Sequence, residues 1–229
     1  MVNQSQLDEL QVEKIKAEIE SQKALASKLR AEGTFIRRKD AILKQEKEES
    51  DTTVYEQRIY EFTGDVDDDS VGEAITALSE WRARSKDDIT LRLSSPGGYV
   101  IPGLALYDYV LGIRREGIKV YTVALGWAAS MGGILLQAGT KRYIAPNAHI
   151  LIHNVASTAR GKLPELEDEV DFLKRLEDRG SAILAERSTM TVAQIKKKMN
   201  RRDWWLGAEE AVTLGFADDL WPPKRKNRR

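Results

Sequence analysis

The chain has 229 residues, of which 41% are hydrophobic and 31% charged, and its 36 basic residues balance its 36 acidic ones. This length fits one domain with an extension, and the charge balance gives no overall attraction to nucleic acid. The chain has no cysteine, which excludes disulfides, thiolate metal sites and a cysteine nucleophile. Only two histidines, His149 and His153, are available to a mechanism that needs a histidine base.

The sequence contains no run of about 18 apolar residues, so we expect no membrane-spanning helix. Its first 20 residues are rich in Glu and Lys and lack the apolar segment of a secretory signal. We therefore expect a cytoplasmic protein, with neither a membrane nor a specific nucleic acid as its partner.

The first 50 residues differ in character from the rest of the chain. They carry ten acidic and ten basic residues, and their few apolar residues recur at spacings of three to five. This pattern predicts a charged helical arm over residues 1–57, and it leaves open whether the arm is coiled-coil-like or partly disordered. At the other end, residues 222–229 are strongly basic and predict a solvated tail.

From Arg58 onward, strand and helix patterns alternate. Thr191 with Gln194 forms a capping box, and Ser70 is the expected N-cap of the first helix. The alternation predicts an α/β fold with mostly parallel strands over residues 58–221. We predict strands at 58–63, 88–93, 119–125, 142–144 and 149–153, and helices at 70–85, 102–113, 164–187, 191–200 and 208–214, with a further short helix opening at 126–133.

Ser130 stands in a segment of small residues, Gly126–Gly133, between a predicted strand and a predicted helix. A serine there would lie near helix N–H groups that lack an intrahelical partner, and small neighbours allow a sharp turn. These are the requirements of a nucleophile elbow, although Ala128 occupies the first glycine position of the G-x-S-x-G pattern. Taken alone, the segment also fits an ordinary turn before a helix.

A second candidate is the Gly97-Gly98 pair, which follows the strand predicted at 88–93. Backbone N–H groups in such a turn can hold an oxyanion, but the pair also fits an ordinary turn between a strand and a helix.

His153 ends an apolar strand, with His149 four residues earlier on the same face. Two residues at that spacing in a strand lie about 13 Å apart, which is too far to share a metal. Asp203 precedes the apolar stretch that starts at Trp204, where a carboxylate can be partly buried against an imidazole. An exposed Asp203 and a structural His153 are the plainer alternatives.

Together these segments resemble the family of the Clp protease proteolytic subunit (ClpP), a serine peptidase, and the chain could be a divergent or phage-type member. The resemblance runs from about Arg58 to Trp221 and rests on six motifs in the family's order. They are RIYEFTGDV, ITLRLSSPGG, GLALYDYV, GWAASMGGILLQAG, KRYIAPNAHILIH and RRDWWLGAEEAVTLGFADDL.

Carried over by position, the resemblance implies that Ser130 is the nucleophile, His153 the general base and Asp203 the carboxylate that orients it. The N–H groups of Gly98 and Met131 match the oxyanion hole. The implied activity is endopeptidase hydrolysis of unfolded proteins or peptides, of the ATP-dependent type, without a metal or other cofactor.

The resemblance also implies a ββα superhelix of the crotonase type, with the helix at 164–187 protruding as a handle. Members form heptameric rings stacked as a tetradecamer with the active sites inside. An AAA+ unfoldase is the usual partner, but residues 1–57 do not look like the family's N-terminal segment, so this partner stays open. Near the site, Asn154-Val155 stand where the family has Gln-Pro, and Trp127 replaces a smaller or polar residue.

Three alternatives remain at this stage. A phage-type capsid-maturation protease of the same family would suit the charged arm. A catalytically silent ring-assembly subunit would share the fold without the activity. A crotonase-type acyl-CoA enzyme would also hold an oxyanion with two N–H groups, but it usually relies on a Glu pair.

Overall fold

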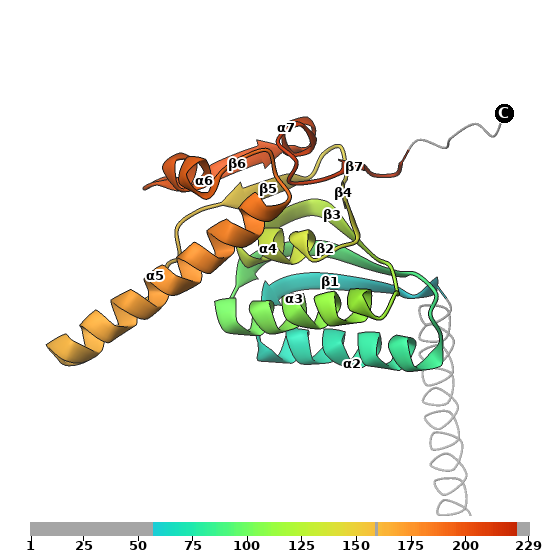
Figure 1. Ribbon diagram of the computed structural model, residues 1–229, viewed down its shortest axis with the longest axis horizontal. Coiled ribbons are helices and arrows are strands. Elements are labelled where there is room, and N and C mark those ends of the chain that lie inside the picture. Colours follow the sequence, from blue (N-terminus) through green and yellow to red (C-terminus); the bar gives the residue numbers. More distant parts are fainter. Residues whose placement is uncertain (1–56, 159, 224–229) are drawn as a thin grey trace, which may run out of the picture. The chain divides into compact units, whose positions relative to one another are not determined.

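The computed structural model describes residues 57–158 and 160–223 (Figure 1). The arm predicted over 1–57 and the basic tail predicted over 222–229 lie almost wholly outside these residues. In the described part, seven strands form one sheet. They are β1 (Ile59–Val66), β2 (Ile89–Gly98), β3 (Val120–Ala129), β4 (Lys141–Ile144), β5 (His149–Ile152), β6 (Trp204–Gly207) and β7 (Asp219–Leu220).

The sheet is mixed, and the path β1-β2-β3-β4-β7 within it is parallel throughout. β3 is central because its first half pairs with β4 and its second half pairs with β5, both in parallel. β6 then pairs antiparallel with β5. The predicted α/β fold with mostly parallel strands is confirmed.

The helices are α2 (Asp68–Arg84), α3 (Val100–Arg115), α4 (Met131–Gln137), α5 (Leu163–Glu186), α6 (Val192–Met199) and α7 (Ala208–Thr213). α2 and α3 lie side by side along the sheet, and α5 projects away from it (Figure 1). The buried residues of α5 are Ser181, Ile183 and Leu184, all near its C-terminal end. No helix in the described residues is long and apolar enough to cross a bilayer.

Several local predictions differ from the structure. α2 is capped by Asp67 rather than Ser70, because the Asp67 carboxylate accepts the Ser70 N–H at 2.8 Å while the Ser70 hydroxyl accepts the Asp67 N–H at 3.0 Å. β2 runs on to Gly98, through the segment predicted as a turn, with a register shift between Leu93 and Ser95. The short strands β6 and β7 were not predicted. The capping box of Thr191 and Gln194 is confirmed.

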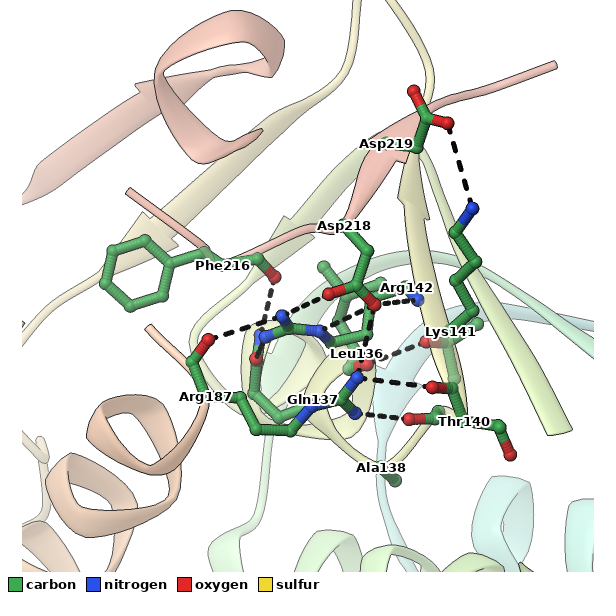
Figure 2. A network of polar contacts seen from close by, with 12 residues as sticks. Leu136, Gln137, Ala138, Thr140, Lys141, Arg142, Arg187, Phe216, Asp218 and Asp219 are labelled. Carbon is green, nitrogen blue, oxygen red and sulfur yellow. Dashed lines mark hydrogen bonds and ion pairs between the residues drawn. The ribbon is translucent and has the colours of Figure 1, made fainter. Parts of the chain in front are cut away.

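A buried arginine, Arg142 on β4, ties several elements together (Figure 2). Its guanidinium donates to Gln137 Oε1 on α4 at 2.5 Å and to Asp218 Oδ1, just before β7, at 2.6 Å. Arg187, at the end of α5, adds a bond to Asp218 Oδ2 at 3.2 Å. Burial raises the pKa of Asp218, but the hydrogen bonds and charge of Arg142 outweigh it, so this pKa lies below the usual 3.8. The network fixes the C-terminal ends of α4 and α5 against the sheet.

Candidate active site

Ser130 occupies the single residue between the end of β3 and the start of α4. Its backbone angles are φ 52° and ψ −119°, in a region that non-glycine residues rarely adopt. Its N–H donates to Leu151 O at 2.8 Å, and its carbonyl accepts the Gly133 N–H at 3.0 Å. A conformation of this kind costs about 1–3 kcal/mol and persists only where its surroundings enforce it. The small residues around Ser130 predicted a sharp turn at this point, and the structure has that turn.

Gly97 on β2 makes the elbow possible by close approach. A Cβ on this residue, whose φ is +98°, would stand 2.6 Å from Ser130 Cβ and 2.9 Å from Met131 N. Gly132 likewise lies close to β2, since its Cβ would be 3.2 Å from Ser95 O. From the sequence, Gly98 was a candidate oxyanion-hole residue, whereas Gly97 was recognised only as half of a glycine pair.

The elbow opens into a pocket of about 330 Å³. Four of the five predicted site residues line it, namely Ser130, His153, Gly98 and Met131. One wall comes from α5, including Leu176, Glu177, Ser181 and Leu184. Most of the lining is apolar, and Ser130 and His153 line the same cavity.

Asp203, the fifth predicted residue, is exposed and does not line the pocket. It directly precedes β6, and the last antiparallel pair between β5 and β6 is Ile152 with Trp204. The same register carried one residue further sets His153 opposite Asp203. Within residues 57–158 and 160–223, no side-chain hydrogen bond joins Ser130 to His153 or His153 to Asp203.

The second histidine, His149, lies at the exposed start of β5, where it pairs with Trp127 on one side and Gly207 on the other. It does not line the pocket. Trp127, 42% exposed, is on the same sheet face. Among the described residues, no group of three His, Asp or Glu side chains is placed to hold a metal ion.

Asn154 and Glu177 were not predicted as site residues. Asn154 follows His153 and donates from Nδ2 to Glu177 Oε2 at 3.0 Å. It also accepts the Arg201 N–H through Oδ1 at 3.1 Å. In the sequence, Asn154 stands out only as a departure from the family's Gln-Pro, and nothing local points to Glu177, which lies 23 residues away.

The sheet, the strained serine at the end of its central strand and the pocket define an α/β protein of the ClpP and crotonase-like fold. A comparison with protein families agrees, because the family model of the Clp protease matches residues 44–224. The chain therefore belongs to the Clp protease family and carries a ClpP-type peptidase domain. The family predicted from the six motifs is confirmed.

Proposed function

We propose that this chain is a serine endopeptidase in which Ser130 attacks the peptide carbonyl of its substrate. The observation that carries the proposal is the strained backbone of Ser130, a residue that lines the same pocket as His153. Strain at a single non-glycine residue, enforced by two backbone hydrogen bonds and a glycine contact, is typical of residues placed for chemistry.

In the proposed reaction, His153 takes the proton of the Ser130 hydroxyl as Ser130 Oγ forms a bond to the carbonyl carbon. The carbonyl oxygen becomes an oxyanion, which the N–H groups of Gly98 and Met131 stabilise. His153 then returns the proton to the departing amine, which leaves an acyl-enzyme. A water molecule, deprotonated by His153, hydrolyses the acyl-enzyme and restores Ser130.

Asp203 is proposed to hold the imidazole in the tautomer that accepts the serine proton. The register between β5 and β6 supports this role, since it directs Asp203 toward the position opposite His153. A carboxylate there also stabilises the imidazolium that forms during the reaction.

Unfolded proteins or peptides are the proposed substrates, hydrolysed inside an oligomeric chamber. The pocket supports an extended segment with apolar side chains, because its lining is mostly apolar. Clp protease family members generally form oligomeric rings, and we propose heptameric rings stacked as a tetradecamer for this chain. Pairing with an AAA+ unfoldase is the corresponding proposal for substrate delivery, and a cytoplasmic location goes with it.

Hydrolysis of fluorogenic peptides by the full chain tests the proposal. We expect turnover by the wild type and by the control Ser157→Ala, an exposed serine outside the pocket, and none above background with Ser130→Ala. Equal turnover by wild type and Ser130→Ala would refute the assignment of the nucleophile. Assembly without turnover in any form would favour the silent ring-assembly subunit.

A further inference from the structure

The segment after His153 is joined to two distant parts of the chain through one side chain. Asn154 donates to Glu177 on α5 and accepts from the backbone of Arg201, at 3.0 and 3.1 Å. The Val155 N–H donates to the same Glu177 oxygen at 3.3 Å. We call these three hydrogen bonds the Asn154 clip. The clip connects the end of β5, the middle of α5 and the loop before β6.

The clip lies immediately beyond the end of the β5–β6 ladder. The ladder ends at Ile152 and Trp204, and the next pair in register is His153 with Asp203. The hydrogen bond from the Arg201 N–H to Asn154 Oδ1 links the two segments beyond the His153–Asp203 pair, on the side away from the ladder. His153 and Asp203 are therefore bracketed by backbone pairing on one side and by a side-chain bond on the other.

The loop before β6 contains a residue with a strained backbone conformation, which this hydrogen bond helps to hold. Arg201 has a φ of +56°, a left-handed conformation that costs a non-glycine residue free energy. Without Asn154, the Arg201 N–H would lose its hydrogen-bond acceptor. The backbone that leads to Asp203 would then be less constrained. Asn154 satisfies that N–H while Glu177 fixes the orientation of the Asn154 amide.

We propose that Asn154 is a positioning residue that holds the Asp203 segment against His153 and makes this placement depend on α5. The role in catalysis rests on the proposed function, whereas the placement itself can be measured separately. Asparagine suits the position because it must accept from Arg201 and donate to Glu177 at once. Aspartate keeps the acceptor but faces the Glu177 carboxylate, and alanine loses both bonds.

The first test measures the rate at which a fluorophosphonate probe labels Ser130 in Asn154→Ala, Asp203→Ala and the double variant. We expect Asn154→Ala to slow labelling about ten- to a hundredfold, because a misplaced catalytic group loses that much. The double variant should match Asp203→Ala, since both changes act through one pair.

The second test measures amide hydrogen exchange over residues 200–204 and does not depend on activity. Asn154→Ala should speed exchange there, Asn154→Asp should restore part of the protection, and the exposed control Asn147→Ala should change nothing. Adding Glu177→Gln to Asn154→Asp removes the repulsion between the two carboxylates and should restore more of the protection from exchange.

The outcomes separate this inference from the proposed function. Unlabelled wild type with exchange at 200–204 that depends on Asn154 would refute the serine peptidase and leave the placement standing. If the wild type is labelled and Asn154→Ala changes neither the labelling rate nor the exchange at 200–204, the positioning role is overturned. Effects of Asn154→Ala and Asp203→Ala that simply add would overturn it as well.

Discussion

Gly97 and Ser130 approach so closely that a Cβ on residue 97 would stand 2.6 Å from the Ser130 Cβ. β2 therefore packs closely against the turn between β3 and α4, and the position of Ser130, the proposed nucleophile, depends on the absence of a side chain at residue 97. Because the Gly97 φ is +98°, a side chain would also strain the backbone.

Gly97→Ala should accordingly displace the elbow. We expect labelling of Ser130 to fall about a hundredfold or more, because a shift of about 1 Å at a reacting group costs that much. The matched control is Gly112→Ala on α3, where an added Cβ meets nothing within 4 Å. That change should leave labelling intact and raise stability by about 0.5–1 kcal/mol in thermal unfolding. Similar behaviour of the two variants would contradict the close-packing argument.

Asp203→Asn tests the third member of the proposed triad. We expect kcat for peptide hydrolysis to fall about 10⁴-fold with little change in unfolding temperature, because an amide favours the wrong imidazole tautomer. Asp108→Asn on α3, also exposed, is the control and should retain full activity. Undiminished hydrolysis by Asp203→Asn would remove Asp203 from the mechanism.

The Asp218 carboxylate should contribute stability that depends on pH. Its pKa is lowered in the folded protein, so its contribution is fully present above the unfolded value near 3.8 and is lost as pH falls through the folded value. Asp218→Asn should cost about 1–3 kcal/mol at neutral pH, since it leaves the buried Arg142 without its anion. The difference from wild type in chemical unfolding should shrink in acid.

Asp219→Asn is the matched control for that network. Asp219 is paired with Lys141 at 3.8 Å on the surface (Figure 2), and an exposed pair contributes about 1 kcal/mol or less. A loss in Asp219→Asn as large as in Asp218→Asn, or one independent of pH, would contradict the role assigned to Arg142.

The projecting part of α5 should carry the contact between rings of the proposed assembly. It exposes Leu163 by 68%, Val170 by 46% and Phe172 by 41% among many charged side chains. Val170→Asp should shift sedimentation toward smaller species, because it puts a charge into an apolar contact. Asp168→Asn on the same helix should sediment as wild type does. Identical sedimentation of all three proteins would argue against a role for this face.

Local patterns predicted much of this fold, and contacts between distant segments supplied the rest. The capping box at Thr191 was predictable because its partners are three residues apart. The N-cap of α2 was predicted at Ser70 but is Asp67. The acidic run before this helix contains several residues that can act as a cap, so the local pattern does not select one. β6 spans only four residues and owes its strand conformation to pairing with β5.

The candidate site was also predicted only in part from local patterns in the sequence. The small residues around Ser130 predicted a sharp turn, and the family motifs indicated His153 and Asp203. The shared pocket of Ser130 and His153 depends on β3 and β5 lying in parallel. The clip between Asn154 and Glu177 depends on where α5 crosses the site, which no local pattern encodes.

Ser130 is proposed to be an activated nucleophile, and the mechanism depends on this role. The most direct measurement is the intact mass of the chain after reaction with a fluorophosphonate probe, comparing wild type with Ser130→Ala. We predict one adduct on the wild type and none on the variant. Absence of an adduct on both proteins, or an equal adduct on both, would contradict this role of Ser130.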